Sequence, residues 1–370
     1  MPSAEARRQR AQLATGGGAE DQLARDAHVA SGVRGLTPGY FALVMGSGII
    51  SLGLDLGGFR SVSAVLFVAG VASYLVLVVL NAWRLVSFHH AMRTDFTDPK
   101  RAFGFFTFVA GTNVLGVRAG EQGWHAVTGG LLVVAGLCWF VLGYVVPWSA
   151  VLGHAERPVL TSANGTWFIW VVASQSVAIA AASLEVVVTN GRIGLAIIAV
   201  FSWSVGVFLY AAVGVFVSLR LMLYRLEPVQ LDPPYWVAMG AVAITVLAGA
   251  RIVEMQTAPM VDATRALIAG LSVVFWCFAT WLIPVLVAAG LWRHAFKRVP
   301  LSYTPGLWSI VFPLGMYAVA STYLGRADHL PILEAIGAVW IWVALTAWVI
   351  VFVAMVRDIA QQLRGATVDA

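Results

Sequence analysis

Charged residues are scarce in this sequence. Of its 370 residues only 11% are Asp, Glu, Lys or Arg, whereas a soluble domain of ordinary composition carries roughly 25%. Hydrophobic residues make up 60% of the chain, and the mean hydropathy is +0.84. This balance excludes an ordinary soluble domain and predicts an integral membrane protein.

Cysteines and the usual motifs of catalysis or metal binding are also few. Cys138 and Cys277 lie inside apolar runs, so we expect no disulfide framework and interpret each as a small buried hydrophobe. His89 and His90 have no Cys or carboxylate at ligand spacing, so no metal or cofactor is expected. No Walker loop, Rossmann fingerprint or Ser-His-Asp arrangement suggests an enzyme or an ATP-driven pump.

The two ends of the chain are polar. The N-terminal stretch has no apolar core of the kind found in signal peptides, so residues 1–33 are interpreted as a disordered cytoplasmic tail. Residues 34–358 form the predicted membrane domain, and 359–370 a short cytoplasmic C-terminal tail.

Ten apolar runs are long enough to cross a bilayer, which needs roughly 20 residues per helix. The sequence therefore predicts an all-α polytopic membrane protein. The expected spans are 37–56, 62–85, 102–119, 124–148, 164–186, 192–224, 233–253, 263–296, 304–325 and 330–357.

The placement of basic residues predicts the orientation. With the N-terminus inside, six of the 23 Lys and Arg residues fall in outer loops, which leaves 17 on the cytoplasmic side. Cytoplasmic loops carry the excess of basic residues in membrane proteins. We therefore expect both termini in the cytoplasm and the protein in the plasma or inner membrane.

One short pattern recurs along the chain. TPGYFALVMGSG at Thr37 and TPGLWSIVFPLG at Thr304 are nearly alike, and every odd-numbered span begins with a related stretch. An aromatic residue at the second aligned position recurs at intervals of 62 to 72 residues, as Phe41, Phe106, Phe168, Trp236 and Trp308. The pattern predicts five repeated helical hairpins around a central pore.

The odd and even spans differ in composition. The even spans are rich in Val, Leu and Trp, which indicates a lipid-facing set, whereas the odd spans carry small and polar residues. Small residues at helix contacts also serve simple packing. Because the polar residues recur at matching repeat positions, we favour a pathway between the odd helices.

Helical spacing predicts which residues line that pathway. Successive layers on one face are Ala42, Thr107, Ile169, Val237 and Ser309, then Met45, Ala110, Val172, Gly240 and Phe312, then Ile49, Val114, Ser176, Ile244 and Met316. The predicted lining residues are Ala42, Met45, Ser47, Ala110, Thr112, Val172, Ser176, Val237, Gly240 and Ser309. The recurring aromatics are expected to wedge against the even helices.

Phe312 is the largest residue of the middle layer, and Pro313 follows it and should kink the helix. An apolar constriction can block ions by excluding water, so Phe312 is a candidate gate. The alternative is that it fills a gap between helices.

Charge indicates what could pass. No Asp, Glu, Lys or Arg lies near the middle of an odd span, which disfavours the acidic rings of cation pathways and the deep carboxylates of proton relays. Arg118, Glu185, Arg251 and Glu254 lie at outer ends, where we expect interfacial exposure. Helix N-termini and a basic cytoplasmic mouth favour small anions.

At TPGYFALVMGSGI, FGFFTFVAGTNVLG, NGTWFIWVVASQSVA and WSIVFPLGMYAVAS the sequence resembles the tellurite-resistance/dicarboxylate transporter family, which includes TehA-like proteins and plant slow anion channels. The resemblance implies ten helices in five hairpins, a pore lined by the odd helices, and a homotrimer with one pore per subunit. It also implies a gating phenylalanine in the ninth helix, at Phe312. Ala42 stands where relatives often have Gly.

Three functions remain open at this point. The leading hypothesis is a passive or facilitated conduit for small anions gated by Phe312. The second is a proton-coupled carrier of dicarboxylate or sulfite, for which Glu185 and Glu254 are the nearest titratable candidates. The third is a sensor or scaffold whose pore is plugged.

Overall fold

The computed structural model describes residues 29–153, 156–256 and 258–365. Within this part of the chain there are ten helical segments long and apolar enough to cross a membrane, and no strand. The predicted all-α membrane fold is therefore confirmed. The segments are Pro38–Leu56, Arg60–Ser87, Ala102–Gly120, His125–Leu152, Gly165–Glu185, Arg192–Leu223, Pro233–Val253, Pro259–Phe296, Pro305–Ala327 and Pro331–Gln362.

Each odd-numbered span begins with a short 3₁₀ turn that leads into an α-helix. Proline is among the first two residues of three of these turns, where its fixed φ suits a helix start and its missing N–H costs nothing. The five pairs are η1 (Pro38–Phe41) with α2 (Ala42–Leu56), η2 (Ala102–Phe105) with α5 (Phe106–Gly120), η5 (Gly165–Trp167) with α7 (Phe168–Glu185), η7 (Pro233–Trp236) with α9 (Val237–Val253), and η9 (Pro305–Leu307) with α11 (Trp308–Ala327).

The even-numbered spans are longer. They are α3 (Arg60–Ser87), α6 (His125–Val146) with the π-helical η3 (Pro147–Leu152), α8 (Arg192–Leu223), α10 (Pro259–Leu291) with the π-helical η8 (Trp292–Phe296), and α12 (Pro331–Gly365). The α12 helix extends past the predicted end of its span at 357 and into the predicted C-terminal tail.

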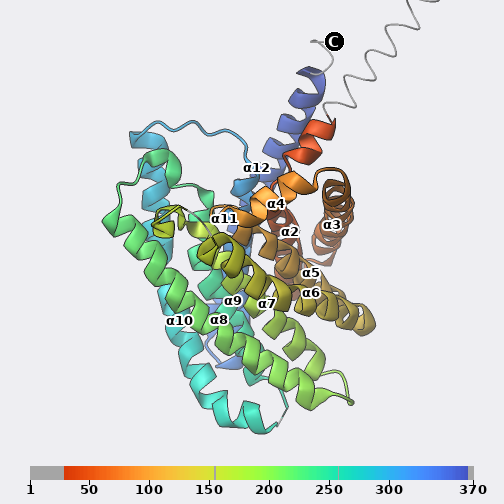
Figure 1. Cartoon of the computed structure of the whole chain (residues 1–370). Coiled ribbons are helices and arrows are strands. Elements are labelled where there is room, and N and C mark those ends of the chain that lie inside the picture. The colour runs from red at the N-terminus through yellow and green to blue at the C-terminus, as the bar shows by residue number, and fades with distance from the viewer. Residues whose placement is uncertain (1–28, 154–155, 257, 366–370) are drawn as a thin grey trace, which may run out of the picture.

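The helices form two layers, with α2, α5, α7, α9 and α11 inside and α3, α6, α8, α10 and α12 outside. In Figure 1 the outer helices α10 and α3 lie on opposite sides of the bundle. In the odd spans 72% to 89% of the most apolar window is buried, against 17% to 33% in the even spans. Each odd helix contacts the next along the chain, and α11 contacts α2. The inner helices therefore form a closed ring.

The outer helices cover the seams of this ring. Each packs against the inner helix before it and the inner helix after it, and α12 packs against α11 and α2. Their remaining faces are apolar and exposed. Cys277 of α10 lies on such a face and Cys138 is only partly buried, so the prediction that both are buried is wrong, because outer-helix side chains face membrane hydrocarbon.

The loop after α3 contains a helix that the sequence did not predict, α4 (His89–Thr97). Its Asp95 is 3% exposed and accepts Nη2 of Arg84 at 2.7 Å and Nε of Arg101 at 3.0 Å. Arg84 is itself buried. The buried carboxylate of Asp95 thus links α4 to the end of α3 through its ion pair with Arg84.

Of the predicted terminal tails, residues 1–28 and 366–370 lie outside the described residues. Residues 29–34 are helical, and Arg84 donates Nε to the carbonyl of Arg34 at 3.2 Å.

The fifth and seventh spans begin in direct backbone contact. A Cβ added at Gly165 would lie 2.3 Å from the carbonyl carbon and oxygen of Pro234 and 2.4 Å from the nitrogen of Tyr235. We expect Gly165→Ala to destabilise the protein by at least about 2 kcal/mol, because backbone atoms must separate to admit the methyl group. Thermal unfolding in detergent measures this. Gly194→Ala in α8 is the control, since its added Cβ meets open space, and equal melting temperatures for both variants would contradict the prediction.

Candidate functional site

A small cavity lies at the centre of the ring, where all five inner helices meet. Its volume is about 20 Å³, enough for roughly one water molecule, and no charged residue lines it. All five residues of the third predicted layer line the cavity, together with residues one turn closer to the C-terminal ends of the helices. The lining residues are Ile49, Leu52, Asn113, Val114, Val117, Ser176, Ile179, Ile244, Leu247 and Met316.

One helical turn before the cavity, the inner helices contribute a layer of fully buried side chains. Residues four apart share a helix face, so the layer of Met45, Ala110, Val172, Gly240 and Phe312 lies below Ile49, Val114, Ser176, Ile244 and Met316. Phe312 is 1% exposed and Met45 is 2% exposed, while Ala110 and Val172 have no exposed surface. Gly240 is buried as well. We call these five residues the Phe312 layer.

Glycines bring α11 close to both of its ring neighbours at this level. A Cβ at Gly46 of α2 would lie 3.1 Å from Cγ1 of Val311, and a Cβ at Gly240 of α9 would lie 2.7 Å from Cγ of Pro313. Pro313 has no N–H, so the carbonyl of Ser309 lacks its usual i+4 donor, yet α11 remains helical through this point. Phe312 is therefore held on a tightly packed segment.

The first predicted layer lies one turn nearer the helix starts. Ala42 is 4% exposed, Ile169 4%, Val237 3% and Ser309 7%. The fifth member, Thr107, turns its hydroxyl to backbone and donates to the carbonyls of Gly104 and Pro38 at 2.7 and 3.0 Å. All members of this layer are thus buried as well.

Two predicted lining residues face elsewhere. Ser47 accepts Nε1 of Trp348 at 2.9 Å, and Thr112 shares a 3.0 Å hydrogen bond with the hydroxyl of Tyr74. Both partners belong to outer helices. The prediction that Ser47 and Thr112 line the axis is therefore not supported, because their hydroxyls are used between the two layers.

These two contacts belong to a set of five. Every outer helix directs one aromatic hydrogen-bonding group at the inner helix that follows it. The other three are Trp139 Nε1 to Ser174 Oγ at 2.9 Å, Trp203 Nε1 to the Thr245 carbonyl at 3.1 Å, and Trp276 Nε1 to Ser321 Oγ at 2.8 Å. The polar residues at matching repeat positions thus serve, in part, to fix the outer helices onto the ring.

Asn113 is the axial residue that the predicted lining omitted. It is 1% exposed, lines the cavity and donates Nδ2 to Oγ of Ser176 at 3.0 Å. Ser176 in turn donates to the carbonyl of Ala173 at 2.7 Å, and Oδ1 of Asn113 has no hydrogen-bond partner. Asn113 and Ser176 are the polar pair in an otherwise apolar lining.

The recurring aromatics mostly pack against outer helices, as predicted. Phe41 contacts Tyr74, Phe168 contacts Tyr210 and Trp308 contacts Trp348, with ring centroids 5.8, 5.3 and 6.2 Å apart. Phe106 instead packs against Trp170 of the inner helix α7 at 6.1 Å. Trp236 is only partly buried.

Two charged residues expected to be exposed at outer ends are buried. Arg118 and Glu185 are each 1% exposed. Glu185 accepts Nη2 of Arg192 at 2.7 Å and the backbone N–H of Gln256 at 3.3 Å. Burial is tolerated because each charge is paired and hydrogen-bonded.

Arg251 and Glu254 remain at the edge of a recess of about 400 Å³ at the C-terminal ends of α5, α7 and α9, and this recess shares Val117 with the axial cavity. Arg251 lies 3.7 Å from a carboxylate oxygen of Glu121 and 3.5 Å from one of Glu254. Burial raises the pKa of Glu254, against the opposing effect of Arg251. The recess thus places one cation between two carboxylates.

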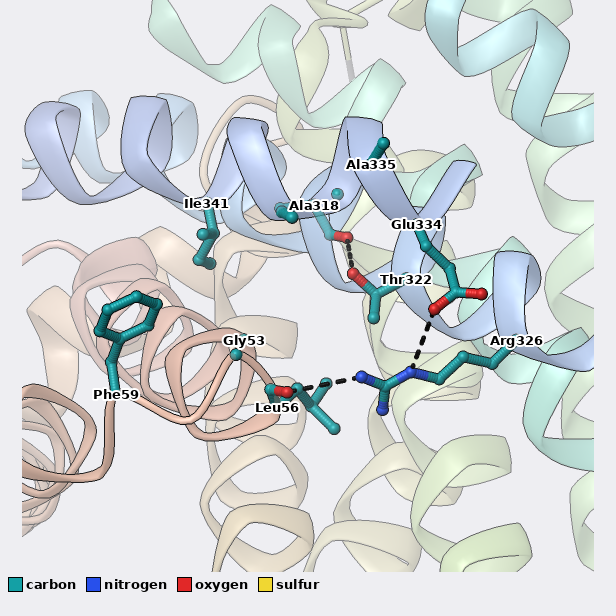
Figure 2. Close-up of a pocket in the computed structure, with 12 residues that line it drawn as sticks. Gly53, Leu56, Phe59, Ala318, Thr322, Arg326, Glu334, Ala335 and Ile341 are labelled. Carbon is teal, nitrogen blue, oxygen red and sulfur yellow. Dashed lines mark hydrogen bonds and ion pairs between the residues drawn. The ribbon is translucent and has the colours of Figure 1, made fainter. Parts of the chain in front are cut away.

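Another pocket, of about 330 Å³, lies between α2, α11 and α12. Figure 2 shows Arg326 at its edge, with one ion pair to Glu334 and one hydrogen bond to the carbonyl of Leu56. None of its lining residues lines the axial cavity, so it is a lateral pocket.

Comparison with known proteins agrees with this architecture. The model of the SLAC1 family, described as voltage-dependent anion channel, matches residues 35–356. A membrane protein of Mycobacterium tuberculosis H37Rv is 62% identical over 153 residues, which cover 41% of this chain and 78% of that protein.

Longer alignments extend to more distant proteins. A protein of Methanocaldococcus jannaschii named as an uncharacterized transporter is 24% identical over 87% of this chain and 92% of its own length. A protein of Arthroderma otae named sulfite efflux pump SSU1 is 24% identical over 85% of this chain and 88% of its own length. Because the family model covers most of the sequence, the chain belongs to the SLAC1 family of anion-transporting membrane proteins.

Proposed function

We propose that the axis of the inner ring conducts small anions and that Phe312, supported by Pro313, is its gate. The observation that carries this proposal is the axial cavity. All five inner helices line it without a charged residue, and one turn below it the side chain of Phe312 is buried. The remaining lining is then Ala42, Met45, Ala110, Val172, Ser176, Val237, Gly240 and Ser309, with Asn113 added and Ser47 and Thr112 removed.

The Phe312 layer explains how the gate would work. An apolar constriction without room for water presents a large barrier to an ion, because no group replaces the hydration shell. Opening requires Phe312 to leave the axis or α11 to shift. Anion preference comes from the absence of carboxylates along the axis, the basic residues of the predicted cytoplasmic mouth and the inward-facing helix starts.

The family resemblance further suggests a homotrimer with one axis per subunit, in the plasma or inner membrane. The predicted orientation, with both termini in the cytoplasm, belongs to the same proposal.

A proton-coupled carrier is the competing function. Two observations favour it: relatives along most of the chain are named sulfite efflux pumps, and the pKa of Glu254 in the outer recess is raised by burial. Glu185 is a weaker candidate, because its ion pair with Arg192 spans only 2.7 Å, whereas Arg251 and Glu254 are 3.5 Å apart. A carrier of this kind would tie anion movement to the pH gradient.

The deciding experiment is anion efflux from proteoliposomes with chloride, nitrate, sulfite and malate, each with and without a pH gradient. For a passive conduit we expect flux that follows the anion gradient and ignores the pH gradient. Flux that follows the proton gradient would favour the carrier. No flux for any anion, even from variants with the constriction removed, would favour a sensor or scaffold.

Asn113 supplies a further test of the axis. We expect Asn113→Leu to lower anion flux about tenfold, because it removes the amide N–H donors from the cavity and leaves a dehydrated ion with fewer partners. The measurement uses proteins that also carry Phe312→Ala, so that the constriction does not mask the effect. Ile244→Leu, a volume-conserving change at another residue that lines the cavity, is the control. Equal flux for both variants would remove Asn113 from the pathway.

A further inference from the structure

A further hollow, larger than those described above, lies at the starts of two inner spans. It has a volume of about 700 Å³ and runs between the end of α10 with η8 and the beginnings of the seventh and ninth spans. We call it the α10 groove. Pro284 lies inside α10, and the helix becomes π-helical at Trp292–Phe296. Both features are common causes of kinks in helices.

The walls of the α10 groove are apolar and open toward the bilayer. Val285, Leu291 and Leu301 line it and are 48%, 58% and 80% exposed. They lie on or beside α10, one of the outer helices that present most of their surface to the membrane. Hydrocarbon is a more favourable occupant than water for such a surface.

The groove also has a polar end with unused hydrogen-bonding capacity. Arg293 donates Nη1 to the carbonyl of Leu231 at 2.7 Å, while its Nε is buried without a partner. Oδ1 of Asp232 is likewise buried without a partner, and burial raises the pKa of Asp232 to about 6, with Arg293 opposing the shift. Both residues line the groove.

The surrounding charge is positive. Lys297 and Arg298 follow η8 directly and are exposed. Together with Arg293 they outnumber the single carboxylate of Asp232. An apolar trough that ends in such a cluster is complementary to an amphiphile with a long hydrocarbon chain and an acidic headgroup.

We propose that the α10 groove binds an acidic phospholipid of the adjacent leaflet, with an acyl chain along Gly290 and the phosphate at Arg293. The groove also touches α11 through Leu307 and Ile310, and Ile310 lies two residues before Phe312. Bound lipid therefore packs against the start of α11, the helix that contains Phe312. The binding site stands independently of transport, whereas an effect of lipid on anion flux rests on the proposed function.

Gly290 provides a direct test. A Cβ added there meets no atom within 4 Å, so Gly290→Leu fills the groove without disturbing the fold. Gly270→Leu is the matched control, because Gly270 lies on the same helix, also meets open space and does not line the groove. Arg293→Gln tests the headgroup contact.

The measurement is native mass spectrometry of the full chain in detergent, titrated with phosphatidylglycerol or phosphatidylcholine. We expect wild type and Gly270→Leu to retain phosphatidylglycerol, Gly290→Leu to retain about fivefold less because the trough is filled, and Arg293→Gln to bind both lipids alike. Equal retention by Gly290→Leu and wild type would overturn the site. Equal binding of both lipids by wild type would overturn acidic recognition. Loss of an oligomer in Gly290→Leu without any lipid bound to wild type would assign the groove to a second copy of the chain.

Anion efflux from liposomes with and without phosphatidylglycerol separates the two proposals. Lipid binding without flux under any condition contradicts the conduit and leaves the lipid site intact. Flux that is the same in both membranes, with binding confirmed, removes only the link between lipid and gate.

Discussion

If Phe312 is the proposed gate, Phe312→Ala should raise chloride and nitrate efflux from proteoliposomes about tenfold or more, because it removes the largest side chain of the Phe312 layer. The other members of the Phe312 layer are Met45, Ala110, Val172 and Gly240, so no second aromatic remains to fill the opening. Single-anion efflux with a halide-sensitive dye or an ion electrode measures the gain.

The control for this prediction is Phe106→Ala. Phe106 is as deeply buried as Phe312 but packs against Trp170, off the axis. Both substitutions lose a large buried ring and should cost stability by about 3 to 5 kcal/mol, yet only Phe312→Ala should raise flux. A gain of similar size in both variants would indicate leakage through a loosened bundle, and unchanged flux in folded Phe312→Ala would exclude the gate.

Arg118→Met should lower the free energy of unfolding by about 3 kcal/mol, because it removes two hydrogen bonds to buried serines and an ion pair from a buried charged side chain. Arg118 joins three helices. It donates Nε to Ser51 at 3.0 Å and Nη2 to Ser63 at 2.9 Å, and its Nη2 lies 3.3 Å from a carboxylate oxygen of Asp55. Thermal or denaturant unfolding in detergent measures the loss.

Two comparisons make this prediction specific. Arg326→Met removes an ion pair whose partners are 46% and 42% exposed, so it should cost less than about 1 kcal/mol. Asp55→Asn combined with Arg118→Met should cost less than the two separate losses together, because both belong to one network. An Arg118→Met protein that unfolds like wild type but transports anions poorly would instead place Arg118 in the pathway.

The two layers of helices could be recognised from composition. Every inner span mixes apolar residues with Gly, Ser or Thr, since close helix packing in a membrane needs small side chains. Every outer span carries large apolar residues, since its surface contacts hydrocarbon. These differences follow from the environment of each helix as a whole, and the burial of the spans confirms them.

The role of individual polar residues could not be read in the same way. Ser47 and Ser176 both lie on inner helices, but Ser47 accepts a hydrogen bond from Trp348 and Ser176 accepts one from Asn113 at the axial cavity. Which side of a helix faces the axis depends on how the helix is rotated about its own long axis. If α5 were rotated by the angle between successive residues, a neighbour of Asn113 would face the cavity in its place. Contacts with helices far away in the sequence set that rotation.

The sequence alone determined that this chain is a ten-span helical membrane protein with a repeated inner and outer set, because hydropathy, length and period are properties of each segment. Only the tertiary structure decided that Arg118 and Glu185 are buried, that Phe312 is buried between inner helices, and that an apolar groove lies between the end of α10 and the start of α11. Those features arise where separate segments meet. Whether a charge can be buried, or a groove stays unfilled, depends on side chains from other helices, which no single segment contains.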